Sequence, residues 1–303
     1  MKPVLLSISG PTAIGKTAWA IRLARHFGTE ILSADSRQFY REMRIGTAVP
    51  EPGELLAAPH HFIQHLSIHD PYSVGDYARD ALACLRHGFR NHPLMILVGG
   101  SGLYTDAVTK GLDAFPEVAP GVREALTRLW ETQGLEALQN LLAEKDPVYH
   151  AQVDLQNPHR LIRALEVCLS GDLPYSGYRG KATPPDFFHH LPLALEAPRE
   201  MIYRRIEARV DAMMAAGLLE EARKLYPMRH LNALQTVGYQ ELFRHLEGEY
   251  DLDTAVAEVK KNTRRFAKRQ LTWLRRDANA LWVPYDADPE AVIGAIQSRL
   301  ETL

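Results

Sequence analysis

Residues 10–17 have the residue types and spacing of a phosphate-binding loop. Their sequence, Gly-Pro-Thr-Ala-Ile-Gly-Lys-Thr, matches the pattern G-x-x-x-x-G-K-T at every fixed position. In such a loop the glycines let backbone amides turn toward an anion, and the lysine adds a positive charge. Diphosphate binding is therefore predicted for Gly10, Pro11, Thr12, Ala13, Ile14, Gly15, Lys16 and Thr17. The Thr17 hydroxyl is predicted to hold a Mg²⁺ ion as a cofactor.

Two elements must position this loop, and the sequence supplies both. The aliphatic run at residues 4–9 is typical of a buried strand ahead of the loop. Apolar residues then recur at helical spacing, at Trp19, Ala20, Leu23, Ala24 and Phe27. A helix beginning near Lys16 would point the positive end of its dipole at the bound anion. This order of strand, loop and helix distinguishes a phosphate-binding loop from a chance glycine turn.

Two more polar segments follow predicted strands. Residues 35–38, Asp-Ser-Arg-Gln, come after a strand predicted at 30–34, and residues 99–102, Gly-Gly-Ser-Gly, come after one at 94–98. Ligands of parallel sheets bind at the carboxyl ends of the strands, so these segments and the phosphate-binding loop are expected to form one site. Asp35 could act there as a general base, cap the next helix, or hold the metal through water.

The third strand lacks the acidic residue that hydrolytic phosphate-loop enzymes use. Such NTPases usually end a strand with a carboxylate near the metal, whereas residues 94–98 are followed by Gly99 and Gly100. Transfer of a group from a bound diphosphate is therefore favoured over hydrolysis.

The histidines and cysteines do not indicate a separate metal centre. Four closely spaced histidines are interpreted as loop residues, because prolines flank them and no cysteine or carboxylate set completes a site: His60, His61, His65 and His69. Cys84 and Cys168 are too few and too isolated for a disulfide framework, which favours a reducing compartment.

Composition is that of a globular protein rather than a membrane or disordered one. The chain has 303 residues, of which 46% are hydrophobic and 24% charged. No apolar run approaches the roughly 20 residues of a membrane span, and the N-terminus has no signal-peptide pattern. A cytoplasmic protein without membrane contact is expected.

The charge is unevenly distributed. Residues 260–276 carry eight basic side chains and no acidic one, although the whole chain has a net charge of −2. On a helix, Arg264 and Lys268 lie four residues apart and repel each other, so an anionic partner would stabilise this segment. A nucleic-acid contact and a merely solvated basic face both remain open. Phe266 and Trp273 are expected to anchor the helix to the body of the protein.

The alternation of strands and helices predicts an α/β fold. We expect a P-loop NTPase-like parallel sheet core formed by residues 1–113 and 189–303, with a helical insertion domain at 114–188. Within the core, strands are predicted at 191–195 and 280–283, and helices at 199–226, 234–246 and 252–276. In the insertion, a helical stretch through Leu142 precedes a break at Asp146-Pro147 and a second helix at 158–169.

Taken together, these motifs closely resemble those of the bacterial tRNA dimethylallyltransferase family, also called tRNA isopentenyltransferases. The matching blocks span nearly the whole chain in the family's order: residues 10–17, 35–40, 45–48, 98–104, 157–167, 237–239 and 263–275. Two positions depart from the family pattern. Val49 stands where lysine is usual, and Ser101 replaces a threonine but keeps a hydroxyl.

The resemblance implies a prenyl transfer to RNA. The phosphate-binding loop would bind dimethylallyl diphosphate, and N6 of the adenine 3′-adjacent to the tRNA anticodon (position 37) would attack its C1 while diphosphate leaves. By match to the family, Asp35 is the general base, Thr12 and Ser101 are hydroxyl donors near the reacting ends, and Arg209 contacts the diphosphate. A surface helix arginine remains the alternative for Arg209.

The acceptor adenine must leave the anticodon loop to reach this pocket, so residues are needed to hold it. The family match implies an anticodon stem-loop with an A-A-A context as partner, and His159 stands where glutamine is often found. The implied tRNA contacts are Asp35, Ser36, Arg37, Gln38, Ser101, Arg123, His159, Arg160, Leu161, Ile162, Arg163, Gln235, Thr236, Val237, Gly238, Tyr239, Gln240, Lys268, Arg269, Gln270, Trp273 and Arg275.

Three other functions would each account for part of the sequence. An adenylate isopentenyltransferase would need neither the insertion nor the basic helix, and a small-molecule ATP kinase would leave the tRNA-matching blocks unexplained. A non-catalytic RNA-binding module would not need Lys16, Thr17 and Asp35 together. A monomeric tRNA prenyltransferase is the leading hypothesis.

Overall fold

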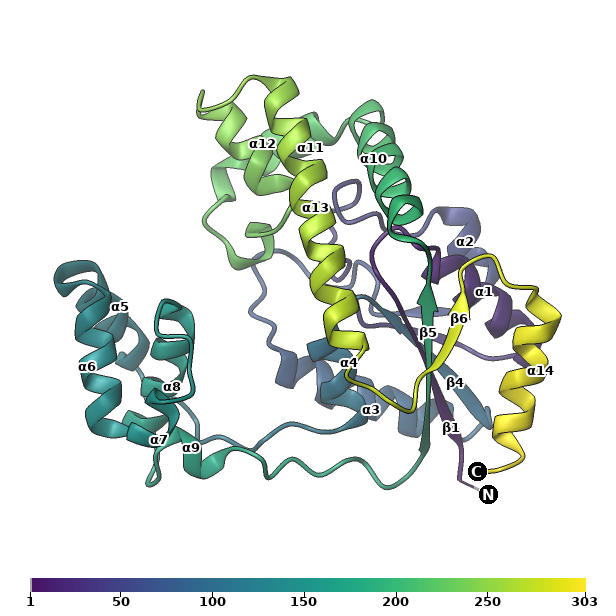
Figure 1. The fold of residues 1–303 in the computed structure, drawn as a ribbon, viewed down its shortest axis with the longest axis horizontal. Coiled ribbons are helices and arrows are strands. Elements are labelled where there is room, and N and C mark those ends of the chain that lie inside the picture. The colour runs from purple at the N-terminus through teal and green to yellow at the C-terminus, as the bar shows by residue number, and fades with distance from the viewer. Residues whose placement is uncertain (1) are drawn as a thin grey trace. The chain divides into compact units, whose positions relative to one another are not determined.

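A parallel sheet forms the centre of the larger of two structural units. The computed structural model describes residues 2–303. Contacts divide them into one unit that contains residues up to 109 together with 185–303, and a second unit at 110–184 (Figure 1). The sequence placed the limits of the insertion at 114 and 188, four residues later at each end.

Six strands build the sheet in the order β3-β2-β4-β1-β5-β6, and every neighbouring pair is parallel. Their bounds are β1 Val4–Ser9, β2 Ile31–Ser33, β3 His60–His61, β4 Leu94–Gly99, β5 His189–Glu196 and β6 Leu281–Pro284. Because β1, β2 and β4 run in the same direction, the segments that follow them emerge at the same edge. His60 and His61 pair with Ile31 and Leu32, so the interpretation of these two histidines as loop residues is wrong.

The helices of the larger unit cover both faces of the sheet. Their bounds are α1 Lys16–Phe27, α2 Pro52–Ala57, α3 Val74–Gly88, α4 Gly102–Thr109, α10 Arg199–Ala215, α11 Leu218–Leu225, α12 Tyr239–Leu246, α13 Leu252–Leu274 and α14 Pro289–Leu300, with short 3₁₀ turns at Tyr226–Met228 and Asn232–Leu234. α1 begins at Lys16 as predicted, directly after Gly15, whose φ of 105° is in the left-handed region.

Two predicted helix limits in this unit are wrong, and one helix was not predicted. The stretch 199–226 is two helices, because Gly217 adopts a φ of 99° between α10 and α11. Residues 234–238 precede α12 rather than form its first turn. α14 was not predicted, although Asp288 caps its N-terminus and Pro289 occupies its first turn, a recognisable start signal.

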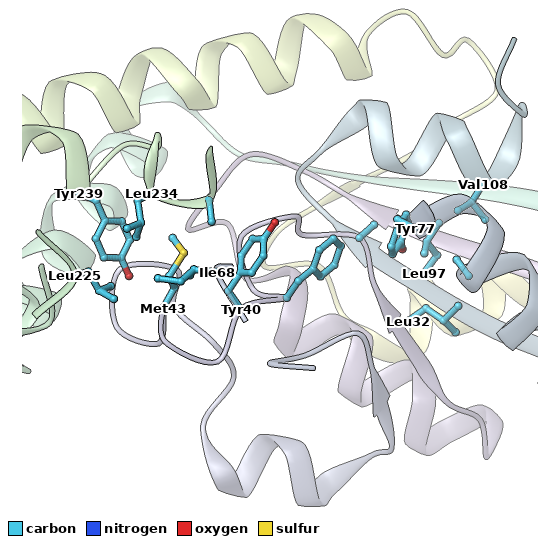
Figure 2. Packing of buried hydrophobic residues seen from close by; sticks show 14 of the residues in the cluster. Leu32, Tyr40, Met43, Ile68, Tyr77, Leu97, Val108, Leu225, Leu234 and Tyr239 are labelled. Atoms are coloured by element: carbon cyan, nitrogen blue, oxygen red, sulfur yellow. The ribbon is translucent and has the colours of Figure 1, made fainter. Parts of the chain in front are cut away.

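Two apolar cores flank the sheet because side chains alternate between its faces. Leu6 and Ile8 of β1 pack with Trp19 and Leu23 of α1, whereas Leu5 belongs to the other core. That second core extends away from the sheet, as Figure 2 shows, from Leu32, Leu97, Val108 and Tyr77 through Tyr40, Met43 and Ile68 to Leu225, Leu234 and Tyr239. It therefore joins the sheet to α11 and α12. No helix within residues 2–303 is long and apolar enough to span a membrane.

The smaller unit is entirely helical. It contains α5 Val122–Gln133, α6 Leu135–Lys145, α7 Pro147–His150, α8 Pro158–Ser170 and α9 Tyr175–Tyr178. Leu126, Leu138, Leu142 and Leu165 form its own core. The predicted helical stretch through Leu142 is interrupted at Gly134, whose φ is 80°.

Candidate functional site

Two backbone carbonyl groups of the phosphate-binding loop accept hydrogen bonds from the loop's own lysine. Lys16 Nζ donates hydrogen bonds to the carbonyl oxygens of Gly10 and Pro11, both at 3.0 Å. Burial lowers the pKa of Lys16 to about 8; the Asp35 carboxylate acts in the opposite direction, and the Arg209 guanidinium adds to the lowering. A bound anion would be attracted more strongly by this buried cation than by a cation in water, because the dielectric constant around it is lower.

One pocket brings the predicted polar segments together, as the sequence predicted. It is lined by Lys16, Thr17, Ser33, Asp35, Gln38, Pro50, His60, Ile63, Val98 and Gly99. These residues come from the first turn of α1, the ends of β2 and β4, and β3 with its flanking loops. Its lining therefore combines a cation, two hydroxyls and a carboxylate with an apolar wall.

Asp35 is fixed by a tight turn rather than by a helix. Its backbone N–H donates to Ser33 Oγ at 3.3 Å, and its Oδ1 accepts from the backbone N–H of Arg37 at 3.1 Å. The next helix is α2, which begins only at Pro52. The helix-cap alternative for Asp35 is therefore wrong, and its carboxylate is available to the pocket that it lines.

The pocket also fits a magnesium ion bound to a diphosphate. The Thr17 hydroxyl and the Asp35 carboxylate line the same space. Mg²⁺ keeps several waters and takes one or two protein oxygens together with substrate phosphate oxygens, so this donor set suits it. Across residues 2–303, no group of three or more His, Cys, Asp or Glu side chains could hold an ion by itself.

Two arginines from α10 reach the phosphate-binding loop. Arg209 Nη1 lies 3.5 Å from Thr12 Oγ1, and Arg205 Nε donates to the carbonyl of Ala13 at 2.7 Å. Burial lowers the pKa of Arg209, while Asp35 opposes that shift. Arg209 is therefore not a free surface arginine. Arg205 was missed, although its spacing of four from Arg209 places both on one helix face.

Gln270 of α13 connects two loops of the site. Its Oε1 accepts from the backbone N–H of Thr12 at 2.8 Å, and its Nε2 donates to the carbonyl of Gly100 at 2.7 Å. The residue is only 7% exposed. Burial and two internal hydrogen bonds occupy this side chain, and the tRNA contact of Gln270 stays a prediction. Trp273 packs so closely on Gly102 that a β-carbon there would lie 2.3 Å from its ring.

The basic residues of α13 divide into two groups. Lys260 pairs with Asp211 at 2.6 Å and Arg264 with Glu207 at 2.8 Å, both across to α10. Figure 1 shows α13 running beside α10. Lys268 and Arg269, further along α13, are exposed and face solvent.

Of the two expected aromatic anchors of this helix, Trp273 packs on Gly102 of α4, whereas Phe266 points to the surface. Phe266 is 39% and Trp273 37% exposed, and the guanidinium of Arg269 lies 5.7 Å from the Phe266 ring. The buried side chains that hold α13 in place include Val259 and Ala267. Arg275 lies just past the helix end and is exposed.

The smaller unit carries a second basic cluster, built on one buried carboxylate. Glu166 is 1% exposed and pairs with Arg123 at 2.5 Å and with Arg163 at 3.4 Å. Arg160 and His159 lie on the exposed side of the same helix, α8. Sequence reasoning missed Glu166, although its position three residues after Arg163 is a helical pairing signal.

Three side chains expected to touch tRNA are buried. Leu161 and Ile162 belong to the core of the smaller unit, at 0% and 4% exposure. Tyr239 is also 0% exposed, and its hydroxyl donates to Glu221 at 2.6 Å. These side chains shape the surface from beneath, and the tRNA contacts of the three residues stay predictions. Val49 is buried as well, so it contributes packing where the family has a charged residue.

The segment before α12 keeps exposed polar groups. Gln235 and Gln240 are exposed and joined by a hydrogen bond of 2.8 Å. Arg37 Nη1 donates to the carbonyls of Asn232 at 2.9 Å and Ala233 at 3.1 Å. The segment is thereby tied to the turn that holds Asp35.

Comparison with known proteins identifies the family. A family model described as IPP transferase matches residues 38–277. The chain is 53% identical over 302 residues to the tRNA dimethylallyltransferase of Christiangramia forsetii, with all of both chains covered. It is 49% identical to that of Flavobacterium johnsoniae, with 98% of each chain covered.

Solved structures agree. The full-length tRNA isopentenylpyrophosphate transferase of Bacillus halodurans is 34% identical, with a TM-score of 0.73 over 99% of this chain and 96% of that one. A eukaryotic dimethylallyltransferase solved acting on tRNA has the same fold, with a TM-score of 0.81 at 22% identity, covering 93% of this chain and 74% of that one. The fold is thus that of a transferase with a P-loop-like parallel sheet. The chain belongs to the IPP transferase family.

Proposed function

We propose that this chain transfers a dimethylallyl group from dimethylallyl diphosphate to N6 of the adenine 3′-adjacent to the anticodon of a tRNA, and releases diphosphate. The observation that carries the proposal is the single pocket lined by Lys16, Thr17 and Asp35. It offers a binding place for a diphosphate beside a carboxylate that can take a proton. The curated relatives are named for the same reaction class.

The diphosphate is the leaving group, so the protein must stabilise the charge that develops on it. Lys16, Arg209 and the backbone amides of the loop supply positive charge there, and burial strengthens their effect. Thr12 and Ser101 are proposed as hydroxyl donors near the reacting ends. A magnesium ion held by Thr17 would neutralise further negative charge when bound.

The acceptor nitrogen must lose a proton as the new C–N bond forms. Asp35 is proposed as the general base: the attack of N6 on C1 breaks the C1–O bond, and the N6 proton passes to the carboxylate. The turn through Ser33 and Arg37 fixes its orientation. Such a proton transfer typically contributes about 10²–10⁴-fold to the rate.

Exposed basic residues supply the proposed contacts with the tRNA backbone. Arg123, Arg160 and Arg163 lie on the smaller unit, and Lys268 and Arg269 on α13. Phosphate contacts position an RNA without selecting its sequence, so selection of an A-A-A context would fall to groups around the pocket. The monomeric state and the cytoplasmic location stay predictions.

The rivals from the sequence are less well supported. A free-nucleotide prenyltransferase would not require the basic cluster built on Glu166. A kinase would leave the exposed cations of α13 without a role.

Incubation with labelled acceptors tests the proposal. Purified protein, Mg²⁺ and labelled dimethylallyl diphosphate are mixed with unmodified tRNA that carries A-A-A beside the anticodon, with AMP and ATP in parallel reactions. Label on the tRNA adenine supports the proposal. Label on AMP alone, or consumption of ATP without transfer, would refute it in favour of the corresponding rival.

A further inference from the structure

The carboxylate of Glu221, which lies outside the pocket, accepts four hydrogen bonds from two segments of the larger unit that are far apart in the sequence. Glu221 Oε2 accepts from the backbone N–H groups of Arg44 at 3.1 Å and Ile45 at 2.9 Å. Its Oε1 accepts from the backbone N–H of Gly46 at 2.9 Å and from the Tyr239 hydroxyl at 2.6 Å. Glu221 on α11 therefore fastens a loop near the sheet to α12.

The fastened loop in turn holds a residue of the pocket. Gln38 Nε2 donates to the carbonyls of Thr47 at 3.2 Å and Ala48 at 2.9 Å, and its Oε1 accepts from Ser33 Oγ at 3.4 Å. Ala48 has a φ of 50°, a conformation that costs a residue with a β-carbon about 1 kcal/mol or more. The loop at 44–48 thus keeps a strained shape, which external contacts must maintain.

The ring of Tyr239 limits what this loop can contain. A β-carbon on Gly46 would lie 2.6 Å from that ring, so only glycine permits the observed approach. A continuous series of contacts therefore runs from Tyr239 through Glu221 and the 44–48 loop to Gln38. Ser33 Oγ ends the series, because it also accepts from the Asp35 backbone N–H at 3.3 Å.

We propose that Glu221 is a positioning residue for the transfer to tRNA, which it serves by fixing the 44–48 loop and, through it, Gln38 beside Asp35. This inference rests on the proposed function. Glu221 does not line the pocket, and the phosphate-binding loop is held by other groups, namely Arg205 and Gln270. Its effect should therefore fall on the acceptor side of the reaction.

The chemistry of the four bonds defines the test. An ionised carboxylate is acceptor-only and has about four lone-pair sites, which matches four donors. A glutamine of nearly the same size would turn one end of the side chain into a donor that faces N–H groups. Glu221→Gln therefore breaks part of the attachment without leaving a cavity. Glu220→Gln is the matched control, since the neighbouring Glu220 is 61% exposed and pairs only loosely with Arg223 at 3.8 Å.

The experiment compares steady-state transfer to tRNA by the full chain and by Glu221→Gln, Glu220→Gln and Tyr239→Phe. Glu221→Gln is expected to lower kcat/KM for tRNA by about tenfold or more, the usual effect of losing charge-assisted hydrogen bonds. Tyr239→Phe removes one donor of four and should show a smaller loss. Glu220→Gln should match the wild type. Dimethylallyl diphosphate affinity, measured by calorimetry, should stay near the wild-type value in all three variants. The melting temperature should fall in Glu221→Gln and less in Tyr239→Phe, because both lose hydrogen bonds of the folded state, and should not change in Glu220→Gln.

The readouts separate positioning from a general structural role. A Glu221→Gln protein with unchanged kcat/KM for tRNA would overturn the inference. So would an equal loss of diphosphate affinity, since the damage would then not be confined to the acceptor side of the reaction. If the wild type itself transfers nothing to tRNA while it binds the diphosphate, the proposed function fails first, and this inference falls with it.

Discussion

Gln270 joins the two loops of the diphosphate site, and replacing it should weaken both the fold and the site. The side chain is buried and makes hydrogen bonds of 2.8 Å with Thr12 and 2.7 Å with Gly100. Each bond contributes about 1 kcal/mol net, and removing one partner leaves a backbone group without its bond. We therefore expect Gln270→Ala to lower the free energy of unfolding of the larger unit by about 2–3 kcal/mol.

Denaturant unfolding followed by tryptophan fluorescence can measure this change. Of the four tryptophans, only Trp130 lies in the smaller unit, so a Trp130→Phe background confines the signal to the larger one. The same proteins are then titrated with dimethylallyl diphosphate. Its affinity should fall in Gln270→Ala, because Thr12 belongs to the loop proposed to bind the diphosphate and would lose its fixed position.

Two further variants make the result decisive. Gln297 is exposed on α14, and Gln297→Ala should change stability by no more than about 0.5 kcal/mol. Gln270→Glu keeps the acceptor for Thr12 but sets a carboxylate oxygen against the Gly100 carbonyl, so it should destabilise the unit as well. Equal unfolding midpoints for Gln270→Ala and Gln297→Ala would refute the reasoning.

Three other outcomes follow from the site. Asp35→Ala should abolish transfer while dimethylallyl diphosphate still binds, because the carboxylate is assigned to the proton; equal loss of binding in calorimetry would contradict that role. Replacing Lys268 and Arg269 together with alanine should weaken tRNA binding and flatten its dependence on salt, since each phosphate contact releases counterions; a slope equal to that of the wild type would count against the contact. Burial lowers the pKa of Lys16 to about 8, so the free protein loses this charge above that pH, and metal-free diphosphate affinity should fall about tenfold per pH unit there. Lys16→Arg, whose guanidinium stays protonated, should show no such fall, and matching pH curves for the two proteins would refute the assignment.

The local sequence was sufficient to predict the central part of the fold. The phosphate-binding loop, the helix that starts at Lys16 and the parallel strands around it follow from motif and periodicity, because each depends on neighbours within a few residues. The sequence also predicted that Asp35 and Gly99 lie beside the phosphate-binding loop, since parallel strands end at one edge of a sheet. Short or interrupted elements could not be predicted in the same way. β3, for example, has only two residues, which is too few for a periodic pattern.

The chain's own sequence therefore determined the α/β class, the family and the residues proposed to bind the diphosphate. Only the tertiary structure decided which charges and polar groups are free to act. Lys260 and Arg264 look like RNA contacts in the sequence but are neutralised by Asp211 and Glu207 of another helix. The Gln270 side chain makes its hydrogen bonds to Thr12 and Gly100 of the protein itself. Such pairings join residues roughly fifty or more positions apart, and no local pattern specifies them, because they form only when packing brings two separate elements together.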